Sequence, residues 1–143
     1  MPGWGKTEQG GAMGEGFGDY WAGDQTAEAS NGHGLLCIAE WDSTSYAPVP
    51  SCLRRLDSAK HFPEDMDGEV HDDGEIWSHA LWDINRALGR TTANRIILES
   101  QFFFNPTITM PAAANLTVIT ARALYGKQAA AKVKAAFHAG GIL

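Results

Sequence analysis

The segment at residues 10–22, GGAMGEGFGDYWA, constrains the fold more than any other part of the chain. Each glycine inside a helix costs about 1 kcal/mol relative to alanine. A helix that carries Gly14, Gly16 and Gly18 therefore usually has another element pressed against its backbone. We expect such a helix over residues 11–29. An acidic, glycine-rich segment near the start of a chain is also typical of a loop or a frayed end, and that alternative stays open.

Two carboxylates in this segment have a spacing that suits a metal site. Glu15 and Asp19 are four residues apart, so a helix would present both on one face. One carboxylate can bind the ion, while the other, one turn away, orients or neutralises the groups around it. The glycines do not have the spacing of a phosphate-binding loop or of a dinucleotide-binding motif.

The composition predicts one domain and excludes several classes of function. The 143 residues include 11 basic and 17 acidic side chains, which gives a formal net charge of −6 without a block of Lys or Arg. We therefore expect neither nucleic acid nor an anionic membrane surface as a partner. No apolar run approaches the roughly 20 residues that a membrane span needs. Residues 1–22 lack the apolar core of a signal peptide.

The domain division predicted from these patterns is a disordered lead-in over residues 1–9 and a single helical domain over residues 10–143. Within the domain, the apolar run at residues 35–39 is consistent with a buried strand. Residues 40–65 are rich in Ser, Pro, Asp and Tyr and read as a long ordered loop with at most fragments of strand. Loops of this length are uncommon in compact domains and often functional.

The rest of the chain predicts four helices with short connections, which is typical of an antiparallel helical bundle. Asp72 or Asp73 can cap the first of them, and Gly89 can end it. Its apolar stripe has helical spacing and consists of Ile76, Trp77, Ala80, Leu81, Ile84 and Leu88. Thr91 or Thr92 can cap the second helix. The three later helices are predicted at about residues 91–104, 110–126 and 127–139.

Two motifs in this order carry a resemblance to a known family. GGAMGEGFGDYWA at residues 10–22 and DGEVHDDGEIWSHALWDINRALG at residues 67–89 resemble fungalysin-type zinc metallopeptidases, which are relatives of thermolysin. The resemblance extends over nearly the whole chain and implies the helical C-terminal part of a catalytic domain that hydrolyses peptide bonds with zinc-activated water. On this resemblance Glu15 is a zinc ligand and Asp19 the carboxylate that orients it. Secretion is also implied.

The resemblance assigns three further residues to the site. His71 would donate a hydrogen bond to the oxyanion formed during peptide hydrolysis. Arg54, with Arg55 as the alternative, would bind the substrate carbonyl through its planar guanidinium. The family supports this histidine with an aspartate five residues earlier, a position that Met66 occupies here. Asp67 is the residue predicted to replace it, with Asp65 as the alternative. The remaining histidines are expected to be structural or solvated.

The chain departs from the family in one large respect. The family takes two zinc ligands and its general base from HExxH, and no two of the five histidines here are four residues apart. We therefore expect weak or absent zinc binding and little peptidase activity from this chain alone. The expected partners are a peptide or protein substrate and the half of the catalytic domain that carries HExxH. Without that half, the uncovered surface of this chain could also form a homodimer. The alternative is a degenerate, non-catalytic homologue that binds a peptide or a partner protein.

The two cysteines allow either a disulfide or two buried thiols. Cys37 and Cys52 are 15 residues apart and flank the Ser- and Pro-rich loop. A bridge between them would contribute about 3 kcal/mol in the loop-entropy description. The disulfide is favoured because the family resemblance implies secretion, and disulfides persist outside the cytosol.

Overall fold

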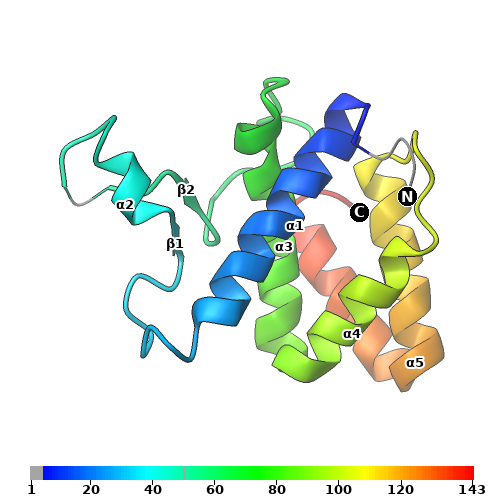
Figure 1. Cartoon of the computed structure of the whole chain (residues 1–143). Coiled ribbons are helices and arrows are strands. Elements are labelled where there is room, and N and C mark those ends of the chain that lie inside the picture. Colours follow the sequence, from blue (N-terminus) through cyan, green and yellow to red (C-terminus); the bar gives the residue numbers. More distant parts are fainter. Residues whose placement is uncertain (1–4, 50) are drawn as a thin grey trace.

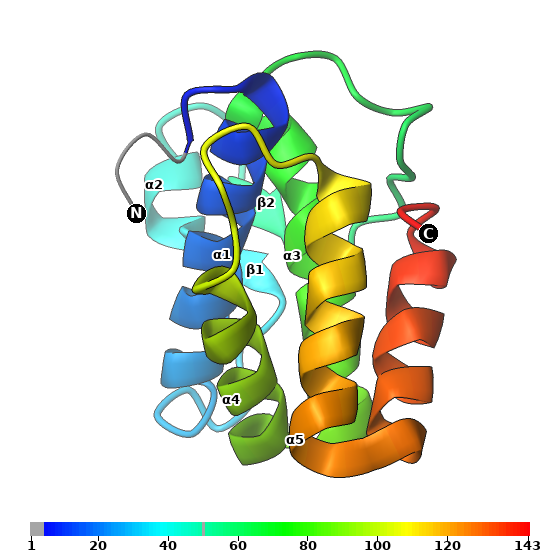
Figure 2. The same ribbon diagram turned by 90° about the vertical axis from the view of Figure 1, so that its right-hand side faces the viewer.

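A computed structural model describes residues 5–49 and 51–143 and shows a mainly helical chain, as predicted (Figure 1). α3 (Val70–Leu88) is central, because it packs against α1 (Glu8–Thr26), α4 (Arg90–Gln101), α5 (Met110–Ala139) and β2 (Arg54–Arg55). Figure 2 shows α1, α3, α4 and both halves of α5 side by side. The elements in chain order are α1 (Glu8–Thr26), β1 (Cys37–Ile38), α2 (Glu40–Ser43), β2 (Arg54–Arg55), α3 (Val70–Leu88), α4 (Arg90–Gln101) and α5 (Met110–Ala139).

α1 begins earlier than the sequence predicted. Its N-cap is Thr7, whose side chain accepts a hydrogen bond from the backbone of Gly10 at 3.1 Å. Gln9 is fixed as well, because its side chain accepts a hydrogen bond from the backbone N–H of Met110 at 2.8 Å. Residues 8 and 9 are therefore helical where a disordered lead-in over residues 1–9 was expected. Residues 1–4 of that lead-in lie outside the described part of the chain. The helix ends at Thr26, three residues before the predicted end.

α1 and α3 are in backbone contact through glycines. A Cβ atom added to Gly16 would lie 2.3 Å from the carbonyl oxygen of Gly74, and one added to Gly74 would lie 3.1 Å from the carbonyl oxygen of Ala12. Gly16 has no room for a side chain, and a side chain at Gly74 would require the backbone of α1 to shift. Gly18 faces the other way, and a Cβ atom added there would meet nothing within 4 Å. The expectation that this glycine-rich helix packs closely on another element is confirmed.

The cap of α3 differs from the prediction. Glu69 is the N-cap, and its side chain accepts a hydrogen bond from the backbone of Asp72 at 2.9 Å. Asp73, a predicted cap, is fully buried inside the helix and accepts hydrogen bonds from the backbones of Asp67 and Gly68. Asp73 therefore stabilises the preceding turn and does not cap the helix, and Glu69 serves as the N-cap. The predicted end at Gly89 is confirmed.

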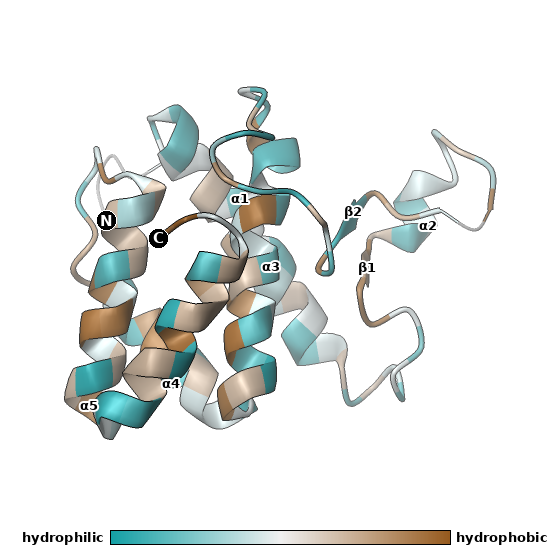
Figure 3. Ribbon diagram, turned by 180° about the vertical axis from the view of Figure 1, so that it is seen from behind, coloured by the Kyte–Doolittle hydropathy of each residue, from teal (hydrophilic) through white to brown (hydrophobic). Residues whose placement is uncertain are grey.

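The C-terminal helices follow the predicted order with small shifts. α4 starts at Arg90, with Gly89 as its N-cap in place of Thr91 or Thr92, and it ends at Gln101 before the phenylalanine run. Thr109 caps α5. Gly126, at φ 83°, breaks α5 into the two predicted helices. Apolar and polar residues alternate around these helices (Figure 3). No described helix has a stretch long and apolar enough to cross a membrane.

The loop between α1 and α3 is organised by a disulfide and a two-stranded sheet. Cys37 and Cys52 are bonded, as favoured from the sequence. β1 and β2 pair antiparallel, with Cys37 opposite Arg55 and Ile38 opposite Arg54. In Figure 1 this region, with α2, projects from one side of the helices. The pairing places Arg54 beside α1.

A buried polar cluster joins the far end of α1 to α3 and α4. The carboxylate of Asp24, which is only 2% exposed, accepts hydrogen bonds from Asn85, Asn94 and Arg90 at 2.8–3.0 Å. Tyr20 donates to Asn94 in the same cluster, and burial raises the pKa of its hydroxyl. Because the central carboxylate is buried and paired with groups from both other helices, the cluster fixes the relative orientation of the three helices.

Replacing each of two glycines with alanine tests the α1–α3 contact. Gly16→Ala must displace the backbone of α3, and we expect it to lower the free energy of unfolding by about 1–3 kcal/mol. Gly18→Ala is the matched control: it meets no atom and improves helix propensity, so stability should rise by up to about 1 kcal/mol. Urea unfolding followed by circular dichroism measures both. Equal effects of the two variants would contradict the close packing.

Candidate functional site

Glu15 and His71 come together on the surface between α1 and α3. Glu15 lies near the middle of α1, and His71 is the second residue of α3. The Oε2 atom of Glu15 is 3.4 Å from Nε2 of His71. The side chains are 42% and 49% exposed, respectively. Two residues separated by more than fifty positions thus present a carboxylate and an imidazole nitrogen to the same open space.

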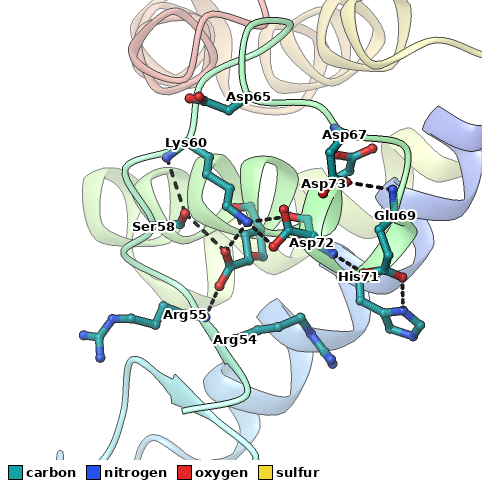
Figure 4. A network of polar contacts seen from close by, with 12 residues as sticks. Arg54, Arg55, Ser58, Lys60, Asp65, Asp67, Glu69, His71, Asp72 and Asp73 are labelled. Atoms are coloured by element: carbon teal, nitrogen blue, oxygen red, sulfur yellow. Dashed lines mark hydrogen bonds and ion pairs between the residues drawn. The ribbon is translucent and has the colours of Figure 1, made fainter. Parts of the chain in front are cut away.

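The other ring nitrogen of His71 contacts Glu69. The Nδ1 atom lies 2.7 Å from Oε1 of Glu69, while Oε2 of Glu69 accepts the hydrogen bond from the backbone of Asp72 (Figure 4). The contact with His71, followed by the backbone hydrogen bond from Asp72, lowers the pKa of Glu69 to about 2. Glu69 thus both caps α3 and orients the imidazole.

Asp67 and Asp65, the carboxylates predicted to support His71, contact backbone groups instead. Asp67 accepts a hydrogen bond from the backbone of Glu69 at 2.8 Å, and Asp65 accepts one from the backbone of His61 at 2.8 Å. Both shape the turn before α3. Sequence reasoning missed Glu69, although a carboxylate two residues before His71 at the start of a helix was a usable signal.

Buried Asp19 and half-buried Arg54 form an ion pair one turn along α1 from Glu15. Arg54 donates from Nε to one carboxylate oxygen of Asp19 at 2.5 Å and from Nη2 to the other at 2.7 Å. The hydrogen bond with Asp19 raises the pKa of Arg54, and the charge of Glu15 contributes in the same direction. Arg55, the alternative, extends away from Arg54 (Figure 4) and pairs with exposed Asp57. Arg54 is therefore the arginine that faces α1.

A second polar network attaches the segment after β2 to α3. Glu75 accepts a hydrogen bond from the backbone of Arg55 at 2.6 Å and pairs with Lys60 at 2.9 Å. Lys60 also pairs with Asp72 (Figure 4). These contacts hold β2 against α3, so Arg54 and His71 belong to one continuous surface.

The chain matches a known protein family over nearly its whole length. The family described as "Thermolysin metallopeptidase, alpha-helical domain" matches residues 6–142. The chain belongs to this family. No curated protein and no solved structure matched the chain in further searches. Membership places the chain among thermolysin-like metallopeptidase domains and implies zinc in the full enzyme.

An open pocket lies beside His71 and Arg54 in this thermolysin-like domain. It has a volume of about 390 Å³ and is lined by Asp42, Tyr46, Leu53, Arg54, Glu69, His71 and Asp72. Leu53 and Arg54 also line a larger pocket of about 910 Å³ on the side of the disulfide. His71 and Arg54 thus border the smaller pocket, and Arg54 also borders the larger one.

Glu15 is suited in part to hold the zinc ion that the family implies. Its carboxylate is accessible, points to His71 and lies one turn from the Asp19–Arg54 pair. A stable zinc site needs three or four protein ligands, and the HExxH histidines have no counterpart in this sequence. Within the described residues, only Asp67, Asp72 and Asp73 cluster closely enough to share a metal ion. Backbone hydrogen bonds to Asp73 and the ion pair of Asp72 with Lys60 already occupy that cluster.

The contact between His71 and Glu69 predicts a measurable titration. Because the pKa of Glu69 is lowered from 4.5 in the unfolded chain to about 2, its ionised carboxylate stabilises the fold above pH 4.5. This contribution is lost as the pH falls toward 2. His71→Ala should raise the pKa of Glu69 part of the way back, because the backbone hydrogen bonds remain. Carboxyl ¹³C NMR against pH measures the shift. His61→Ala, which replaces another exposed histidine, is the control and should leave the pKa of Glu69 unchanged. An unaltered Glu69 titration in His71→Ala would contradict the contact.

Proposed function

We propose that this chain supplies the helical half of the active site of a secreted, fungalysin-like zinc metalloendopeptidase. The proposal rests chiefly on one observation, the 3.4 Å approach of Glu15 to His71 beside the Asp19–Arg54 pair. Glu15 serves as a zinc ligand, and Asp19 fixes the polar groups around it. Family membership and the Cys37–Cys52 disulfide support an extracellular location.

His71 and Arg54 both present nitrogen atoms to the pocket, where a peptide carbonyl could bind. Glu69 contacts Nδ1 of His71, which leaves Nε2 on the open side of the ring, 3.4 Å from the carboxylate of Glu15. The Nε and Nη2 atoms of Arg54 are committed to Asp19, whereas Nη1 has no hydrogen-bond partner among residues 5–49 and 51–143. Both residues can therefore stabilise negative charge that develops on a carbonyl oxygen. Zinc, when bound, supplies Lewis-acid polarisation of the same region.

The remaining ligands and the general base must come from outside this sequence, which contains no HExxH. We propose as partners a peptide substrate and a segment that carries HExxH and covers the exposed face of α1, where Gly18 leaves open space. A second copy of the chain is the alternative cover for this face. Little or no peptidase activity is expected without the HExxH segment.

The absence of HExxH also favours a second candidate function. A degenerate homologue would keep the pocket beside His71 as a binding surface for a peptide or protein. The gene distinguishes the two candidates. An in-frame HExxH encoded upstream of Met1 would support the enzyme, whereas a stop codon directly upstream would support the binding module.

Zinc binding tests the role of Glu15. We expect the chain to bind zinc weakly, and Glu15→Gln to weaken binding at least about tenfold, since it removes the only predicted anionic ligand. Calorimetry with zinc measures the affinity, and NMR shows whether the signals of Glu15 and His71 move. Glu99→Gln on the exposed side of α4 is the matched control. Unchanged zinc affinity in Glu15→Gln would refute the ligand assignment. We expect the chain alone to be inactive, so peptide hydrolysis by the chain that is lost in Glu15→Gln would refute that expectation.

A further inference from the structure

In the pocket of about 390 Å³ beside His71, one of the three carboxylates has no polar partner among residues 5–49 and 51–143. Asp72 pairs with Lys60, and Glu69 contacts His71. Arg54, the cation of the pocket, is neutralised by Asp19. The side chain of Asp42 has no hydrogen bond or ion pair to any residue in the described ranges. Asp42 therefore contributes a negative charge to the pocket that no described residue pairs with.

Tyr46 and Leu53 add apolar surface to the same pocket. Tyr46 is 76% exposed, which is high for an aromatic side chain, and Leu53 is 38% exposed. The face of a tyrosine ring attracts a cation, and an apolar wall suits the aliphatic stem of a long side chain. A carboxylate, an aromatic ring and an apolar wall together match lysine or arginine.

The loop that carries Asp42 and Tyr46 is held in place before any ligand binds. The disulfide between Cys37 and Cys52 closes it. Inside the loop, the buried hydroxyl of Ser43 contacts both the carbonyl and the hydroxyl of Ser51, at 2.9 and 2.8 Å. The backbone of Tyr46 donates to the carbonyl of Ser43 at 2.9 Å. Such pre-organisation reduces the entropy lost on binding.

We propose that this pocket binds a positively charged side chain of the peptide substrate, with Asp42 as the specificity-determining residue. The inference rests on the proposed peptidase function and adds the substrate class. A lysine or arginine side chain would lie between Asp42 and Tyr46, next to the peptide carbonyl that faces His71 and Arg54. The disulfide-closed loop would thereby select basic positions in a substrate.

Binding of short peptides tests this charge preference without requiring catalysis. The full chain, labelled with ¹⁵N, is titrated with N-acetylated, C-amidated tripeptides Gly-X-Gly in which X is lysine, norleucine or glutamate. Norleucine matches the lysine stem without its charge. We expect the lysine peptide to move the signals of Asp42, Tyr46 and His71, and to bind at least about threefold more tightly than the norleucine peptide.

Variants assign the preference to individual residues. Asp42→Asn should remove the preference for lysine over norleucine, and Asp42→Lys should reverse it in favour of glutamate. Tyr46→Leu should reduce the preference about twofold. Glu99→Gln changes the net charge by the same amount as Asp42→Asn but lies on α4, so it should leave the preference intact.

The outcomes separate this inference from the proposed function. Equal affinity for the lysine and norleucine peptides, or a lysine preference that persists in Asp42→Asn, overturns the charge selection and leaves a peptide site at His71 in place. Signals near residues 42, 46 and 71 that do not move with any peptide overturn the inference. Zinc binding to Glu15 is measured independently of these peptides.

Discussion

The close contact between the backbones of α1 and α3 is the constraint on which the site depends. Gly16 and Gly74 allow it, because a Cβ at either position would meet the opposite backbone. Helices with ordinary side chains at the contact lie with their axes about 8–10 Å apart. Glu15 is adjacent to Gly16, and His71 is three residues before Gly74. The glycines that weaken α1 in isolation thus bring a carboxylate and an imidazole from two helices to 3.4 Å.

Local backbone groups organise the other half of the site. The start of α3 is shaped by the carboxylates of Asp67, Glu69 and Asp73, which all accept backbone hydrogen bonds. Only Glu69 also reaches His71. A single side chain therefore couples the position of the helix start to the orientation of the imidazole. On the opposite side, Asp19 couples α1 to Arg54 through two hydrogen bonds, and the β1–β2 pairing places that arginine.

Most of the fold could be predicted from the sequence, because it follows from local patterns, and two motifs suggested which residues form the candidate site. The apolar stripe of α3, the stop at Gly89 and the break at Gly126 are properties of short segments. The extension of α1 to Glu8 could not be predicted, because it depends on Gln9 meeting Met110, about a hundred residues away. The role of Glu69 was missed for a related reason. Several acids lie close to His71 in the sequence, and the turn geometry set by buried Asp73 decides which of them reaches Nδ1 of the ring.

The attraction between Glu15 and His71 is too weak to hold the site together. Both side chains are more than 40% exposed, and ion pairs in such surroundings contribute at most about 1 kcal/mol. The helices that carry them are instead fixed by buried contacts, including the Asp24 cluster at the far end of α1. The site residues therefore keep their positions whether or not they contact one another. The scaffold thus holds a carboxylate near a histidine without relying on their mutual attraction, and this is how functional side chains are pre-organised in proteins.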